Sequence, residues 1–344
     1  MIDDDPYERC LPTAELAVEI GHRYGLGRPD RWRDLGGSFT TNVLLEFGET
    51  ARVARIHRDW TTPERLAALQ GARRAIAAAG IPTVTPLPDP TGDTMITVDN
   101  GRLVELEPFV TWNRRMNTPD LLRVGFGALA RVHDSLRTAD LPAAADTVAY
   151  ANHLSSADAA ALTRAGAERM RSWQDPMLGD YPDAVVRHVD TVTALESELA
   201  DVQRRQLVHG DFWDNNVLFA DDQLAAVIDV DFMAERWRID DLALTIWFFL
   251  LEPGRGLPDA GDRRMVRELL DRYDAATTEP LSRAERLALP LAVARQPAWS
   301  AGRWIRDLDD DGARKHAVAA VGELPVAQAV LQDLELWRQD LTAN

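Results

Sequence analysis

Residues 207–219 read Leu-Val-His-Gly-Asp-Phe-Trp-Asp-Asn-Asn-Val-Leu-Phe, and residues 226–232 read Ala-Val-Ile-Asp-Val-Asp-Phe. Each stretch joins an apolar, strand-like run to a polar turn, which predicts strand, loop, strand and acidic turn in that order. Asp211 and Asn216 would lie on the loop, and Asp229 at the end of the second strand. Because the sequence around this segment is mostly helical in its periodicity, the segment is where we expect the chemistry.

The order of these three polar residues suits phosphoryl transfer. That reaction needs a carboxylate that accepts or orients the proton of the attacking hydroxyl, and it needs oxygen ligands for Mg²⁺. Asp211 can fill the first role, and Asn216 and Asp229 can fill the second. The alternative is that all three only cap turns, where Asp and Asn are common. Turn formation, however, does not require this ordered set.

Residues 209–211 (His-Gly-Asp), followed after four residues by Asn216, resemble the catalytic loop of the aminoglycoside phosphotransferase family. That family has homoserine-kinase-like and choline-kinase-like relatives. Residues 227–229 resemble its counterpart of the kinase Asp-Phe-Gly motif, and residues 241–243 resemble its downstream Asp-Leu-Ala. The resemblance implies an α+β, bilobal protein-kinase-like fold. A small β-rich N-terminal lobe with one main helix would precede a larger, mostly helical C-terminal lobe.

The predicted lobes are residues 1–106, which would bind the nucleotide, and residues 107–344, which would hold the catalytic loop and the acceptor site. In the first lobe, Thr62 and Pro63 predict the start of a helix that ends near Gly80. Strands are expected over 52–57, 94–98 and 103–106. In the second lobe, apolar periodicity predicts helices over 119–137, 183–205, 240–251, 263–276, 290–306 and 324–341.

The resemblance implies that the cofactors are ATP, or GTP, and Mg²⁺. Gly36, Gly37 and Ser38 would cover the phosphates with their backbone amides. Residues 106–110 look like the hinge between the lobes. The C=O of Glu107 and the N–H of Phe109 would there contact the adenine, since the intervening proline has no N–H.

Arg55 occupies the place of the lysine that contacts phosphates in kinases, within Val53-Ala54-Arg55-Ile56. The only lysine of the chain is Lys315, so an arginine must supply this positive charge, and its planar fork suits phosphate oxygens. A kinase pairs this cation with a glutamate of the neighbouring helix. Glu64 and Gln70 both lie on the predicted helix, and the sequence does not decide the partner.

The formal net charge is −17, which argues against a nucleic-acid partner because nucleic-acid binders carry a basic surface. Net acidity either serves solubility or favours a cationic substrate. The candidate walls of the acceptor pocket are acidic and aromatic residues near the second metal ligand: Trp213, Asp231, Glu235, Trp237 and Asp240. A neutral acceptor would instead depend on hydrogen bonds and on stacking against the tryptophans.

We therefore expect an ATP-dependent kinase that phosphorylates a hydroxyl of a small molecule, for example an aminoglycoside or nucleoside antibiotic. The alternative is a metabolic kinase for homoserine, an amino alcohol or a sugar. A third reading is a catalytically dead ATP-binding scaffold, against which the intact Asp211, Asn216 and Asp229 argue. Neither a signal-peptide pattern nor a membrane-spanning apolar run is present, so we expect a cytoplasmic protein without a membrane partner.

Overall fold

The strands of the N-terminal sheet present alternate residues to opposite faces, and a different helix lies on each face. In the computed structural model, apolar residues of β2 (Thr41–Phe47), β3 (Thr50–Ile56) and β5 (Leu103–Pro108) pack against helix α1 (Ala14–Arg23). The intervening polar residues face helix α2 (Pro63–Ala78). The register pairs Arg55 of β3 with Glu105 of β5. Strand periodicity therefore separates an apolar core from a charged layer.

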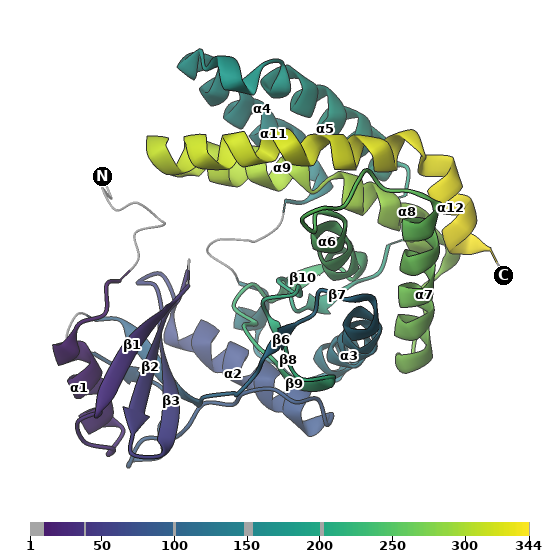
Figure 1. Cartoon of the computed structure of the whole chain (residues 1–344). Coiled ribbons are helices and arrows are strands. Elements are labelled where there is room, and N and C mark those ends of the chain that lie inside the picture. The colour runs from purple at the N-terminus through teal and green to yellow at the C-terminus, as the bar shows by residue number, and fades with distance from the viewer. Residues whose placement is uncertain (1–9, 38, 99–100, 148–153, 200–202, 344) are drawn as a thin grey trace. The chain divides into compact units, whose positions relative to one another are not determined.

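The structure describes residues 10–37, 39–98, 101–147, 154–199 and 203–343. It divides into two units (Figure 1). The first comprises residues 1–114, 139–149 and 218–228, and the second comprises residues 115–138, 150–217 and 229–344. The boundary expected at residues 106 and 107 stays a prediction. No helix of the described residues combines the length and the apolar character needed to cross a membrane.

The first unit contains an antiparallel sheet of five strands in the order β1-β2-β3-β5-β4, with β1 at Arg31–Gly36 and β4 at Ile96–Thr97. A smaller sheet has the order β6-β8-β9, from Arg114–Arg115, Val217–Ala220 and Gln223–Val227. The helix predicted after Thr62 is confirmed as α2, and the Thr62 side chain accepts a hydrogen bond from the N–H of Arg65. The short α1 was not predicted.

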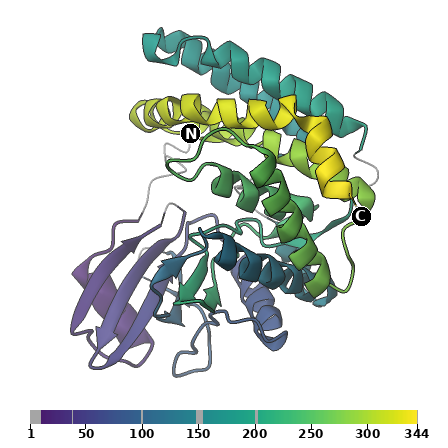
Figure 2. The ribbon, with the colours of Figure 1, turned by 45° about the vertical axis from the view of Figure 1, so that its right-hand side comes forward.

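The second unit is mostly helical, and it contains one antiparallel strand pair, β7 (Arg205–Val208) with β10 (Ala234–Trp237). The loop with Asp211 and Asn216 follows β7. Helices α4, α5 and α11 lie side by side (Figures 1 and 2) and share one apolar core. The longer helices are α3 (Pro119–Thr138), α4 (Ser156–Trp173), α5 (Tyr181–Ser197), α6 (Ile239–Leu250), α7 (Ala260–Ala276), α8 (Arg283–Ala294), α11 (Asp310–Gln332) and α12 (Leu334–Thr342).

Three helix predictions in this unit were wrong in their bounds. The helix expected over 183–205 ends at Ser197, and Arg205 begins a strand. The helix expected over 290–306 is several elements: α8, the short α9 (Pro297–Trp299), a π-helical turn (Ser300–Trp304) and α10 (Ile305–Asp307). The one expected over 324–341 is split between α11 and α12. Helix α4 was missed, because its alanine-rich sequence has little apolar periodicity.

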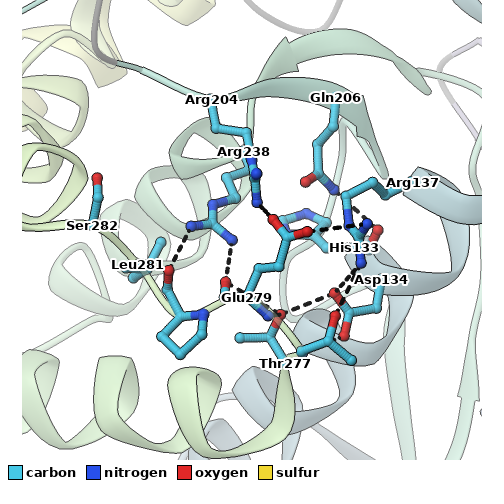
Figure 3. Close-up of polar contacts among 12 residues, drawn as sticks. His133, Asp134, Arg137, Arg204, Gln206, Arg238, Thr277, Glu279, Leu281 and Ser282 are labelled. Carbon is cyan, nitrogen blue, oxygen red and sulfur yellow. Dashed lines mark hydrogen bonds and ion pairs between the residues drawn. The ribbon is translucent and has the colours of Figure 1, made fainter.

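A buried arginine ties β10 to the segment between α7 and α8 (Figure 3). Arg238 donates to both carboxylate oxygens of Glu285, at 2.5 and 2.8 Å, and to the backbone oxygens of Glu279 and Pro280, at 2.6 and 3.0 Å. On the same segment, the side chain of Glu279 pairs with the more exposed Arg204 and Arg137. The end of β10 is thereby fixed by a charge that has been removed from water but is fully hydrogen-bonded.

We expect Arg238→Ala to lower the free energy of unfolding by about 3–5 kcal/mol, because it leaves the buried Glu285 carboxylate without its partner. Arg204→Ala is the matched control. It removes an arginine that pairs with the same segment but is 41% exposed, so its cost should stay below about 1 kcal/mol. Urea unfolding of both variants measures the difference, and equal losses would contradict this account.

Candidate active site

The catalytic loop begins with a glycine that no other residue can replace. Gly210 has a φ of +83°, and a Cβ at this position would lie 2.1 Å from the carbonyl oxygen of Phe232. The loop therefore passes directly against the backbone that follows Asp229 and Asp231. The glycine of the His-Gly-Asp pattern is therefore required for packing, because it lets the segment of residues 207–219 approach the segment of residues 226–232.

Asp241, at the start of α6, holds this loop by its backbone. Its Oδ2 accepts hydrogen bonds from the N–H of His209 at 2.8 Å and from Nε2 of His133 at 3.0 Å. Its Oδ1 accepts from the N–H of Gly210 at 2.9 Å. Burial by itself would raise the pKa of Asp241, but the hydrogen bond and charge of His133 outweigh it and lower the pKa. Asp241 was not predicted as a site residue, although the Asp-Leu-Ala motif contains it.

Asp211 is buried and oriented by Asn216. The amide nitrogen of Asn216 donates to the backbone oxygen and to Oδ2 of Asp211, both at 2.8 Å. Burial raises the pKa of Asp211 well above its usual range, and the negative charge of Asp229 raises it further. Asp229 is one of three described non-glycine residues with positive φ, at +64°. Strained backbone of this kind gathers at functional sites.

These residues fit a Mg²⁺ site of the sparse type that binds metal together with phosphates. The amide nitrogen of Asn216 faces Asp211, so its side-chain oxygen points away from Asp211 and can serve as a ligand. The repulsion between Asp211 and Asp229 shows that negative charge is concentrated here. Among the described residues, no group of three or more His, Cys, Asp or Glu side chains is arranged to hold a metal ion. One carboxylate and one amide oxygen suffice where phosphate and water complete the coordination.

In the first unit, the partner of Arg55 lies on a strand and not on the helix. Nη1 of the buried Arg55 is 3.8 Å from Oε1 of Glu107 on β5. Helix α2 contributes a second cation, Arg73, which pairs with both Glu105 and Glu107. It also contributes Gln70, whose amide donates to Glu105 at 3.1 Å. The helix thus supplies positive charge where a protein kinase supplies a glutamate, and the carboxylates come from β5.

The carboxylate of Glu105 is at the centre of this charged layer. Burial by itself would raise its pKa, but the charge of Arg73 and the hydrogen bond from His57, at 3.2 Å, lower it. Glu105 therefore stays ionised and balances the two arginines. This layer was not predicted, because the two glutamates alternate with apolar residues in a strand that reads as plain core sequence.

The other residues that were predicted to contact the nucleotide lie outside this charged layer or were expected to act through their backbone. Gly36 and Gly37 form a tight turn with φ of +93° and +112°, and a Cβ on Gly37 would lie 2.0 Å from the carbonyl oxygen of Thr40. Ser38 lies outside the described residues. The N–H of Phe109 already donates to the carbonyl oxygen of Ala51 at 3.3 Å. The expected adenine contact would therefore require this hydrogen bond to open, and Glu107 has a role through its side chain that the sequence did not reveal.

Three of the five predicted acceptor residues line one pocket of about 590 Å³ within the second unit: Glu235, Trp237 and Asp240. The other two do not line this pocket. Trp213 instead packs its ring on Phe248, with centroids 4.3 Å apart, and Asp231 stands in the turn before β10. Residues from α4, α5 and the segment after α8 also line this pocket, and the assignment of the five residues to an acceptor site stays a prediction.

Comparison with known proteins identifies the family and the fold. The pattern of the phosphotransferase enzyme family (APH) matches residues 32–284. A homoserine kinase of Rhodospirillum rubrum is 27% identical over 285 residues, which cover 78% of each protein. A homoserine kinase of Afipia carboxidovorans is 28% identical over 232 residues, or 63% of this chain and 60% of that enzyme. The crystal structure of an aminoglycoside phosphotransferase from Alicyclobacillus acidocaldarius superposes with a TM-score of 0.66 at 14% identity, covering 96% of this chain and 98% of that one.

The fold is thus the α+β fold of protein-kinase-like enzymes, with an N-terminal antiparallel sheet and a helical C-terminal region. The chain belongs to the phosphotransferase enzyme family, and it is a small-molecule kinase with an alcohol group as acceptor. Kinases of this family use ATP and a divalent metal ion. The resemblance stated from the sequence is therefore confirmed at the level of the family and of the fold.

The raised pKa of Asp211 has a consequence for stability. The folded protein holds this proton more tightly than the unfolded chain, whose aspartates titrate near about 3.9. The free energy of unfolding therefore falls as pH rises from that value through the folded pKa. Asp211→Asn removes the titration, so its stability relative to wild type should be greater at pH ~8 than at pH ~5. Urea unfolding without nucleotide or Mg²⁺ measures this, and a pH-independent difference would count against it.

Proposed function

We propose that the chain transfers the γ-phosphoryl group of ATP to the hydroxyl of a small metabolite of the homoserine or amino-alcohol class. The observation that carries the proposal is the buried carboxylate of Asp211, oriented by Asn216 and placed beside Asp229. Two curated relatives are homoserine kinases. Their similarity favours a metabolic acceptor over the antibiotic acceptor that the sequence first suggested.

In this proposal Asp211 accepts the proton of the acceptor hydroxyl as its oxygen attacks the γ-phosphorus, while the bond to the β-phosphate oxygen breaks and ADP leaves. Asn216 keeps the carboxylate in one orientation, and Asp241 keeps the loop in place. Asn216 and Asp229 would hold Mg²⁺, which neutralises phosphate charge when bound. Arg55 would contact phosphate oxygens, and the turn at Gly36 and Gly37 would offer backbone amides.

The experiment follows radiolabelled γ-phosphoryl transfer from ATP to L-homoserine, amino alcohols, sugars, aminoglycosides and nucleoside antibiotics. Asp211→Asn should lower kcat for the best acceptor by roughly 10²–10⁴-fold, the usual contribution of a positioned acid–base group. Its affinity for a fluorescent ATP analogue should remain, which separates lost chemistry from lost binding. Near-normal turnover by this variant would remove Asp211 from the mechanism, and no transfer to any acceptor would favour the scaffold reading.

The charged layer of the first unit gives a separate prediction for the nucleotide. Arg55→Met should raise the KM for ATP by roughly 10–100-fold, the equivalent of losing hydrogen bonds to a charged group. Glu107→Gln should act in the same direction but more weakly, because the Glu107 side chain would affect the phosphates through the arginines with which it pairs, Arg55 and Arg73. Arg52→Met is the control. It lies on the same strand but on its opposite face, and it should leave the KM for ATP unchanged. If Arg55→Met also leaves it unchanged, Arg55 is no phosphate ligand.

A further inference from the structure

A tyrosine on α7 is hydrogen-bonded to the cluster that holds the catalytic loop. The side chain of Tyr273 is buried in the second unit, and its hydroxyl lies 2.8 Å from Nδ1 of His133 on α3. The two rings meet edge to face, with centroids 5.7 Å apart and an interplanar angle of 70°. Burial raises the pKa of the Tyr273 hydroxyl, so it stays protonated and can either donate or accept a hydrogen bond.

Both ring nitrogens of His133 are engaged, so the ring has one favoured orientation. Its Nε2 lies 3.0 Å from Oδ2 of Asp241. An ionised carboxylate can only accept, so Nε2 carries a hydrogen and donates it. A rotation of the ring by 180° would turn carbon atoms toward both partners. The Tyr273 hydroxyl therefore supplies one of the two hydrogen bonds that select the orientation in which His133 donates to Asp241.

The orientation of His133 matters because Asp241 also binds the catalytic loop. The same Oδ2 atom accepts from the N–H of His209, and Oδ1 accepts from the N–H of Gly210. Asp211 is the next residue. A buried carboxylate that lost the His133 donor would have fewer hydrogen bonds and could tilt toward other donors. A tilt of this carboxylate moves the two amides, and with them the carboxylate of Asp211.

Helix α7 is attached to α3 by other contacts as well, so removing the hydroxyl leaves the two helices in place. Just beyond the end of α7, the hydroxyl of Thr277 donates to the carboxylate of Asp134 at 3.0 Å (Figure 3). Within α7, Glu268 accepts from Nη2 of Arg123 at 2.7 Å. A phenylalanine in place of the tyrosine would also keep the ring. The hydroxyl can therefore be removed as a single interaction.

We propose that Tyr273 is a positioning residue for phosphoryl transfer: its hydroxyl orients His133 toward Asp241 and thereby fixes the loop that carries Asp211. This inference rests on the proposed function, because it takes Asp211 as the group that accepts the proton. Tyr273 acts on the reaction only through His133. Misplacing a catalytic group by a fraction of its reach lowers the rate of the chemical step, so the effect is expected in kcat more than in the KM for ATP.

The first test is Tyr273→Phe, measured with ATP and the best acceptor found. We expect kcat to fall by roughly 3–10-fold, the equivalent of one hydrogen bond between uncharged groups, with little change in the KM for ATP. Tyr181→Phe is the matched control. It also removes a buried hydroxyl from the second unit, but that hydroxyl has no hydrogen-bond partner among the residues that the structure describes. Its kcat should equal that of wild type.

A double-mutant cycle shows whether Tyr273 acts through His133. In His133→Gln, the amide nitrogen of the glutamine can replace Nε2 as donor to Asp241, but nothing replaces Nδ1 as partner of the tyrosine. Adding Tyr273→Phe to this variant should therefore leave its kcat unchanged. If the tyrosine only supported the packing of α7, Tyr273→Phe would lower kcat by the same factor in both backgrounds.

Hydrogen exchange followed by mass spectrometry tests the loop without relying on turnover. The peptide with the amides of His209 and Gly210 should exchange faster in Tyr273→Phe than in wild type or Tyr181→Phe. Unchanged exchange, an unchanged kcat, or equal kcat factors in the two backgrounds of the cycle would each overturn the inference. Failure of the proposed function would look different: no acceptor would receive phosphate from ATP, or Asp211→Asn would keep near-normal turnover, while the difference in exchange remained.

Discussion

The carboxylate of Asp241 is the one group on which the rest of the catalytic geometry depends. It accepts three hydrogen bonds, two from consecutive backbone amides of the catalytic loop and one from His133. A carboxylate buried without these donors would be strongly disfavoured. The same donors would be left unsatisfied without the carboxylate. Because the carboxylate and its donors each need the other, these hydrogen bonds favour one position of the loop. Asp211 follows directly after Gly210, so the same hydrogen bonds fix its position.

In both units, buried carboxylates are neutralised by buried arginines. In the first unit, Glu105 and Glu107 balance Arg55 and Arg73, and in the second, Asp240 and Glu196 balance Arg295. A guanidinium offers five donors, so one side chain can bind two carboxylates at once and satisfy each. A lysine would be a poorer choice for such buried, branched clusters. The near absence of lysine from the chain is therefore consistent with its sites.

The sequence predicted the parts of the site that lie close together along the chain. Asp211, Asn216 and Asp229 follow strands within a short segment, so local patterning is enough to propose them as one candidate site. The pairing of Arg55 with Glu107 could not be found in this way, because it requires the register between β3 and β5, which are separated in the sequence by α2 and β4. The break after α8 was also missed. A π-helical turn keeps helical periodicity almost intact, so the sequence pattern does not reveal it.

The pocket that Glu235, Trp237 and Asp240 line shows that the net charge of a chain is a poor guide to the charges at one place on it. The chain has 55 acidic and 38 basic residues apart from histidine, yet the pocket gathers four arginines. Exposed charges act over about 8 Å at physiological salt, so acidic residues elsewhere on the surface contribute little inside a pocket. Within it, Asp240 is already bound by Arg295. What a ligand would meet in this pocket is set by the side chains that line it, and four of these are arginines although the chain as a whole is acidic.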